Sequence, residues 1–190
     1  MIFEKAKEFI LEKLEQELPP HLTYHDIRHI LDVYQASINY AQLEGVNDED
    51  TLLLKTASLF HDSGFVIQAE NHEAISCQIA EEILVNFHYS TEQIQKIKGM
   101  IMATKIPQTP TTHLEEILAD ADLDYLGRDD FEEISERLFQ ELKLSNRNDW
   151  NKIQISFFEK HKYFTKSAKE LRNVKKQENL QRIIAQTQFN

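Results

Sequence analysis

Apolar residues recur three and four positions apart along almost the whole chain, the spacing of one face of a helix. Residues able to cap a helix precede several of these segments. The pattern predicts an all-α protein with about nine helices. Seven of the expected ranges are about 3–18, 26–43, 49–62, 71–88, 91–104, 148–162 and 165–188. A capping box of Ser90 and Gln93 precedes the helix over 91–104. Two more boxes, Thr112 with Glu115 and Asp129 with Glu132, mark the starts of the sixth and seventh helices.

The segment 49–62 is nearly continuous in apolar residues, as is typical of a central buried helix. It runs directly into His61 and Asp62. Helix spacing places His61 on the same stripe as Leu54 and Ala57, so its ring is expected to point inward. An inward charged Asp62 is costly to bury unless a cation or several hydrogen bonds satisfy it. A metal ion would meet that requirement.

A second inward histidine is predicted on the helix over 26–43. His29 shares a stripe with Val33 and Ala36, which places its ring against a packed interior. His25 lies one turn earlier on the same side. A His-x-x-x-His pair is by itself more often unliganded than metal-binding, so it needs further support.

An acidic cluster at residues 120–124 supplies candidate carboxylates. Helix spacing aligns Asp122 with the apolar residue Leu118 and so points Asp122 inward. Asp120 and Asp124 are predicted to share a neighbouring, more polar face. Asp122 is therefore the expected carboxylate ligand, with Asp120 as the alternative.

Composition narrows the class of protein. With 190 residues, 41% of them hydrophobic, the chain is long enough for one domain with a sizeable core. A net charge of -11 argues against binding long nucleic acid, because affinity for a polyanion comes mainly from Lys and Arg. Cys77 is the only cysteine, which excludes a disulfide within the chain and a thiolate-cluster metal site. No apolar run approaches the ~18 residues of a membrane span, so a cytoplasmic protein is expected, and a homo-oligomer is left open.

Five segments, taken in order, resemble the motifs of the HD superfamily of metal-dependent phosphohydrolases, in which a His is followed by His-Asp and then by a later Asp. They lie within about 22–127, and the helices after residue 128 carry none of them. The chain is thus expected to be a single HD-type domain over 1–190, with its motif-bearing core at about 22–127 and a C-terminal helical extension over 128–190. The segments are Tyr24-His25-Asp26-Ile27-Arg28-His29, Ser58-Leu59-Phe60-His61-Asp62-Ser63-Gly64, Asn71-His72-Glu73, Ala103-Thr104-Lys105 and Ala119-Asp120-Ala121-Asp122-Leu123.

This resemblance implies a site for one divalent metal ion, with open positions for water and a phosphate oxygen. Mixed imidazole and carboxylate ligation suits Mn, Fe, Co, Ni or Zn better than Ca, and Mg is retained as a candidate. The implied reaction is cleavage of a phosphate ester or anhydride of a small molecule, a nucleotide or cyclic nucleotide, by metal-activated water. The implied ligands are His29, His61, Asp62 and Asp122.

Further residues are candidates for catalysis and substrate binding. Asp62 and His72 are the expected catalytic residues, and His72 is expected to position phosphate or act as a general acid. Lys105 is expected to neutralise substrate phosphate as a point charge. Thr104 and His25 are expected to contact substrate, with a purely structural role as the alternative for each.

Two other functions fit the same residues. One is a regulatory module that binds metal and nucleotide with little turnover, and the other is an oxygenase, for which the chain is short of ligands for two irons. Trp150, Ile153 and Phe157 follow helix spacing, which favours packing over a platform for stacking bases. Lys175 and Lys176 are predicted to be a solvated pair.

Overall fold

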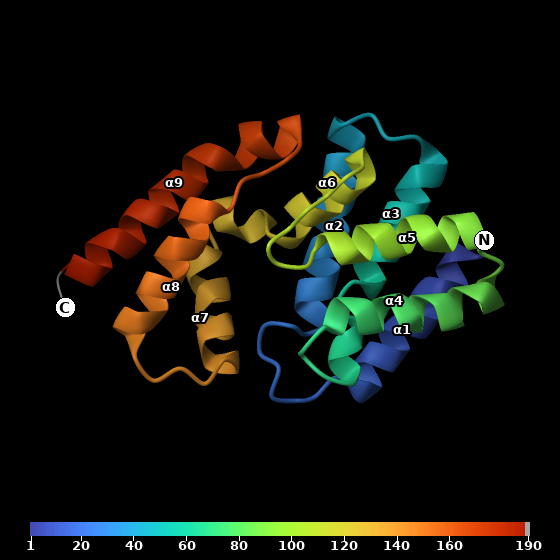
Figure 1. Ribbon diagram of the computed structural model, residues 1–190, viewed down its shortest axis with the longest axis horizontal. Coiled ribbons are helices and arrows are strands. Elements are labelled where there is room, and N and C mark those ends of the chain that lie inside the picture. The colour runs from blue at the N-terminus through green and yellow to red at the C-terminus, as the bar shows by residue number, and fades with distance from the viewer. Residues whose placement is uncertain (189–190) are drawn as a thin grey trace.

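The computed structural model describes residues 1–188, and all regular structure within that range is helical. The predicted all-α class is therefore confirmed. None of the described helices combines the length and the apolar character that crossing a membrane requires. The α-helices in Figure 1 are α1 (Phe3–Glu17), α2 (Ile27–Leu43), α3 (Asp48–Phe60), α4 (His72–Leu84), α5 (Thr91–Ala103), α6 (His113–Asp122), α7 (Phe131–Glu141), α8 (Arg147–Lys160) and α9 (Lys166–Gln188).

Two hydrophobic clusters hold these helices together. The larger is built mainly from α1 to α6, and central residues such as Ile10 and Leu53 are fully buried in it. The smaller joins the short turn Asp124–Gly127 to α7, α8 and α9, with Phe131 and Phe158 in its interior. In Figure 1 the helices α7 to α9, coloured orange to red, lie together on one side of α1 to α6. Three of the predicted site residues, Asp62, His72 and Asp122, line a cavity together with side chains of the smaller cluster.

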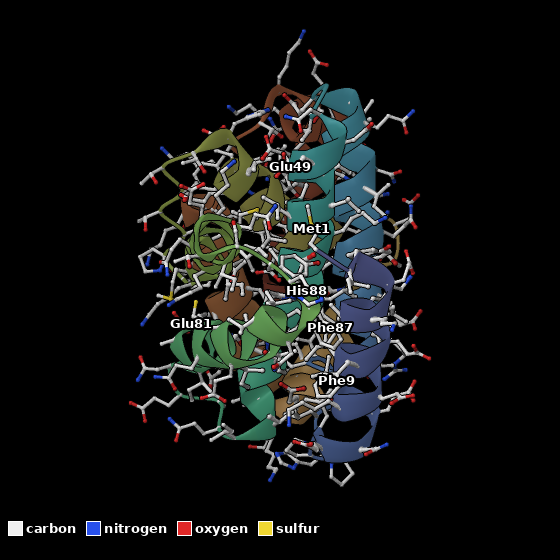
Figure 2. The ribbon with its side chains drawn as sticks, turned by 90° about the vertical axis from the view of Figure 1, so that its right-hand side faces the viewer. Met1, Phe9, Glu49, Glu81, Phe87 and His88 are labelled. Carbon is white, nitrogen blue, oxygen red and sulfur yellow. The ribbon has the colours of Figure 1, made fainter. Side chains whose placement is uncertain are left out.

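The N-terminal end of α1 contacts the short turn Val85–Phe87 that follows α4. The backbone N–H of Ile2 donates to the carbonyl of Phe87 over 2.8 Å. The rings of Phe9 and Phe87 pack with their centroids 5.8 Å apart, and Figure 2 shows both side chains at this end of the molecule. This contact closes the larger cluster on the face opposite α7 to α9.

Local capping signals located two of the helix starts. The capping boxes predicted before α5 and α6 are confirmed, with both reciprocal hydrogen bonds present in each. The box predicted at Asp129 is wrong. Asp130 is the residue that precedes α7, and its carboxylate accepts from Arg128 instead of capping the helix, while Asp129 pairs with Lys175. A local pair with Arg128 holds the carboxylate of Asp130, and a tertiary pair with Lys175 holds that of Asp129, away from the helix start.

In the last helix, α9, one of the two lysines predicted to be solvated is buried. Lys175 is on the surface, as expected, but Lys176 is only 4% exposed. Its ammonium donates to the carbonyl of His161 over 2.5 Å, and burial lowers its pKa to about 8. The prediction of two solvated lysines is therefore wrong for Lys176, because α8 and the chain that follows it cover that face of α9.

Candidate metal centre

The start of α2 places the first histidine. Asp26 precedes the helix, and its carboxylate accepts from the backbone N–H groups of Arg28 and His29. His29 thus lies in the first helical turn, with its ring 5% exposed and packed against Tyr24 at a centroid distance of 4.6 Å. The ring of His29 therefore points into the interior, as helix spacing predicts.

His61 and Asp62 follow the last turn of α3. The α-helix ends at Phe60, two residues earlier than expected. His61 is fully buried, and its Nδ1 lies 2.8 Å from the Ser58 carbonyl. Because a carbonyl only accepts, Nδ1 carries a proton, and in the neutral ring the lone pair is on Nε2, which faces the centre. This is the tautomer that a metal ligand needs.

The carboxylate of Asp122 arrives from the last residue of α6. Its Oδ1 lies 3.2 Å from Nε2 of His29 and 3.4 Å from Nε2 of His61, and those two nitrogens are 3.3 Å apart. Three ligands in tetrahedral directions at metal distances of ~2.0–2.1 Å lie roughly 3.3–3.4 Å from one another. The triangle formed by these three residues therefore fits a divalent ion, and all its ligand atoms lie within 4.8 Å of one another.

Asp62 adds a second carboxylate to the group. Its Oδ2 lies 3.3 Å from Nε2 of both His29 and His61. That oxygen is buried, yet no described donor meets it in hydrogen-bonding geometry. A buried carboxylate oxygen without a donor is destabilising unless a cation satisfies it. The donor set of His29, His61 and Asp122 fits a metal ion, and the unsatisfied oxygen of Asp62 lies beside the two imidazoles.

The charges of the cluster are strongly coupled. Burial by itself lowers the pKa of His29, but the facing carboxylates of Asp122 and Asp62 outweigh burial and raise it to about 9. The pKa of His61 is likewise raised well above its usual range, with the charge of Asp62 opposing burial. Burial raises the pKa of Asp122, but the two imidazoles reverse this and bring it to about 2. Without an ion the imidazoles hold protons, and a cation would displace them.

The turn after Asp62 brings a third histidine to the cluster. A Cβ on Gly64 would lie 2.1 Å from the carbonyl oxygen of His72, so only glycine allows the turn to approach the start of α4 this closely. The backbone N–H of Gly64 also donates to Ser76 over 2.8 Å. As a result, Nε2 of His72 lies 3.3 Å from Oδ1 of Asp62. Burial lowers the pKa of His72, but Asp62 outweighs it and the net direction is upward.

The other predicted substrate residues divide into two groups. His25 and Thr104 line the cavity that opens from Asp62 and Asp122. Nδ1 of His25 is paired with Glu141, and its ring stacks on Phe65 at 4.1 Å. The hydroxyl of Thr104 donates to the carbonyl of Ile101 over 2.8 Å.

Lys105 does not line this cavity. The α-helix ends at Ala103, and the next turn carries the Lys105 side chain out to the surface, where its ammonium donates to Asn71 over 3.2 Å. The nearby hollow that it lines contains none of the four proposed ligands. Helix spacing predicts the direction of a side chain only within the helix, and Lys105 lies beyond the end of α5.

Asp120 and Asp124 are not on a polar face, contrary to the prediction. Both are buried, at 0% and 3% exposure. Asp120 accepts from the backbone N–H groups of Phe164 and Thr165 over 2.8 Å each, and from the Thr165 hydroxyl over 2.7 Å. Burial raises its pKa to about 6. The chain before α9 covers this side of α6, so Asp120 anchors α9 and faces away from the imidazoles.

The Asp120→Ala substitution is expected to lower the free energy of unfolding by about 2–3 kcal/mol, because three donors lose a buried acceptor. Metal content should stay at the wild-type level. Urea denaturation and elemental analysis of the purified variant measure the two quantities. A variant of unchanged stability that no longer binds metal would place Asp120 among the ligands instead.

Two residues near the centre carried no decisive sequence signal. Glu73 is 7% exposed and its Oε1 lies 3.7 Å from Nε2 of His72, on the wall of the cavity. Its position beside His72 was the available clue. Glu141, at the end of α7, holds His25 and accepts from the backbone N–H groups of Tyr24 and His25 over 2.7 and 3.0 Å. Nothing in the sequence connects Glu141 to a histidine 116 positions away.

Comparison with known proteins gives one sequence relative and clear structural likenesses. No protein-family model matches the chain. An uncharacterized protein from Clostridium beijerinckii is 37% identical over 83 residues, which are 41% of this chain and 51% of the relative. The match thus spans about half of the relative's length.

Two crystal structures share the fold over nearly the whole chain. A predicted HD superfamily hydrolase from an uncultured Thermotogales bacterium has a TM-score of 0.65 at 20% identity, with 94% of this chain and 91% of that chain covered. A protein from Lactobacillus plantarum has a TM-score of 0.72 at 17% identity, with both chains covered completely. At these identities the likeness establishes the fold, and the coverage includes the helices after residue 128.

Proposed function

We propose that this chain, which has the fold of an HD superfamily hydrolase, is a metal-dependent phosphohydrolase that cleaves a phosphate ester or anhydride of a small molecule. The observation that carries the proposal is the buried triangle of His29, His61 and Asp122, with sides of 3.2 to 3.4 Å, beside a cavity. A divalent ion bound there would lower the pKa of a water molecule and withdraw charge from a phosphoryl group.

Asp62 has two roles in this proposal. Its Oδ2 faces the two imidazoles, and its Oδ1 lies 3.3 Å from Nε2 of His72. One carboxylate thereby orients both the metal ligands and the histidine that reaches the cavity. A carboxylate that fixes an imidazole in this way keeps a proton available at a defined atom.

His72 is proposed to supply that proton. Its Nδ1 lies 3.0 Å from the carbonyl of Ala69, which holds the ring in place, and its raised pKa favours the protonated form. In hydrolysis, the oxygen of water joins phosphorus, the bond from phosphorus to the leaving oxygen breaks, and that oxygen takes a proton. Nε2 of His72 is positioned to donate it or to hold a phosphoryl oxygen.

The experiment that tests this proposal combines metal analysis with phosphate release. Purified protein is expected to contain metal, and metal added at about 100 times its Kd should stabilise the fold by about 2.7 kcal/mol. Phosphate release is then measured with nucleotides, cyclic nucleotides and simple phosphomonoesters, under Mn, Ni, Co, Mg and Zn in turn.

The outcomes separate the candidate functions. Turnover with at least one substrate supports the enzyme. A metal-loaded protein that binds nucleotides but hydrolyses none of the panel would support a regulatory module instead. A protein that contains no metal and gains no thermal stability from any of the five ions would overturn the metal centre itself.

A further inference from the structure

A cavity of about 270 Å³ opens directly from the candidate metal centre. Asp62, His72 and Asp122 line one end of it. The remaining wall comes largely from the turn before α7 and from α7 and α8, and these two helices carry none of the HD-like motifs. An apolar cavity of ~150 Å³ is already large enough for benzene, so this one accommodates a substantial organic group.

The wall of the cavity is apolar along most of its length. Aromatic and aliphatic side chains dominate it, and the polar groups that α7 and α8 contribute, those of Ser135, Trp150 and Gln154, are already partnered. The hydroxyl of Ser135 donates to Gln154 over 2.6 Å, and the indole N–H of Trp150 donates to Ser135 over 3.2 Å. These groups have little capacity left to recognise the hydroxyls of a sugar or the edge of a base.

The mouth of the cavity is also apolar. Ile106, Leu142 and Ile153 are each 51% exposed, and all three line it. Large aliphatic side chains that are half exposed around one opening mark a surface that binds an apolar group. The packing role expected for Ile153 from helix spacing is thus incomplete, because half of its surface faces the opening instead of the core.

The electrostatics of the cavity limit the number of phosphates it takes. Among the described residues that line it, none is Lys or Arg, whereas Asp62, Glu73 and Asp122 are carboxylates. Additional phosphates would meet carboxylates or apolar walls without a cationic partner, at the cost of burying uncompensated charge. A single phosphate at the metal end is the arrangement that these charges favour.

We propose that the substrate is a monophosphate ester of a compact apolar group, an aryl or short alkyl chain, and that this group occupies the cavity between α7 and α8. The proposal rests on the phosphohydrolase function above and names its substrate class. The continuity of the apolar cavity with Asp62, His72 and Asp122 carries it, because the ester's two parts then match the two ends of one cavity. Nucleotides are expected to be poorer substrates.

Binding of the apolar group by itself can be measured without turnover. Metal-free protein is titrated with 1-naphthol, followed by the change in naphthol fluorescence. The KM values of metal-loaded protein for 1-naphthyl phosphate and for AMP are then compared from initial rates. We expect 1-naphthol to bind saturably, and the KM for 1-naphthyl phosphate to be at least about tenfold lower than that for AMP, a gap that burial of a few apolar carbons supplies.

The Ile153→Asn substitution tests where the apolar group binds. Ile153 is exposed enough for the variant to fold, and its loss should weaken 1-naphthol binding about fivefold, as expected when part of an aliphatic contact is removed. The matched control is Leu171→Asn on α9, which is 50% exposed and does not line the cavity, and should bind 1-naphthol like the wild type.

Each result has a definite meaning. Saturable 1-naphthol binding that weakens in Ile153→Asn but not in Leu171→Asn supports the apolar site. If such binding is found but no ester is hydrolysed with any metal, the phosphohydrolase function is overturned and the apolar site stands. Hydrolysis of AMP at or above the rate for 1-naphthyl phosphate would overturn the apolar substrate while the phosphohydrolase stands. Absence of naphthol binding, together with a wild-type dimer that Ile153→Asn dissociates, would assign the surface to a second copy of the chain.

Discussion

The Asp62→Ala variant is expected to lose bound metal and to release phosphate roughly 10³-fold more slowly than the wild type, or slower still. Asp62 contacts both imidazoles of the triangle through Oδ2 and His72 through Oδ1, each over 3.3 Å. Among the described residues, its removal leaves Asp122 as the one carboxylate facing the imidazoles of His29 and His61, and it leaves His72 without the group that orients it. Elemental analysis and phosphate release measure the two effects.

The control for this variant is Asp149→Ala. The Asp149 side chain is 63% exposed on α8, so its removal takes away one negative charge without touching the cluster. Circular dichroism shows whether each variant keeps its helices. An Asp62→Ala protein that folds, retains a full equivalent of metal and turns over like the wild type would remove Asp62 from both of its proposed roles.

The Asp124→Ala variant is expected to lower the free energy of unfolding by about 3–5 kcal/mol, the range for breaking a buried ion pair from one side. Asp124 is 3% exposed and accepts from the hydroxyl of Tyr40. It also accepts from Arg172 over 2.6 and 3.1 Å and from Arg128 over 3.4 Å. One carboxylate thus connects α2, the turn before α7, and α9.

Urea denaturation monitored by circular dichroism tests this effect, with the change appearing as a lower midpoint. Asp129→Ala is the comparison, because the Asp129 side chain is 92% exposed and pairs with Lys175 at the surface. Its midpoint should stay close to that of the wild type, since screened surface pairs contribute little. Equal midpoints for the two variants would show that the buried network does not hold α9 to the rest of the fold.

Local sequence signals were sufficient for the helices and for the direction of several side chains. A helix repeats every 3.6 residues, so the stripe shared by His29 and Val33, or by Asp122 and Leu118, reports which face of the helix packs. Capping boxes depend only on residues three positions apart, and those before α5 and α6 were found for that reason. The order of the motifs then linked residues that lie far apart along the chain.

The acidic cluster shows the limit of that reasoning. Asp120 and Asp122 are two residues apart on α6 and so lie on nearly opposite faces, and helix spacing chose correctly which of them faces the imidazoles. Helix spacing predicted a polar environment for Asp120 and Asp124 because it takes into account only the residues of that one helix. Whether the Asp120 face of α6 contacts water or protein depends on where α9 and the residues before it pack. No pattern within α6 contains that information.

The sequence by itself thus determined the all-α class, most helix bounds and the inward residues that converge on the centre, because each depends on spacing within one helix. Tertiary structure alone decided three further features: the burial of Asp120 and Asp124, the displacement of Lys105 from the cavity, and the apolar wall that α7 and α8 add beside Asp62. Each depends on how segments many residues apart pack against one another. Helix spacing reports the direction of a side chain but not the element that it meets.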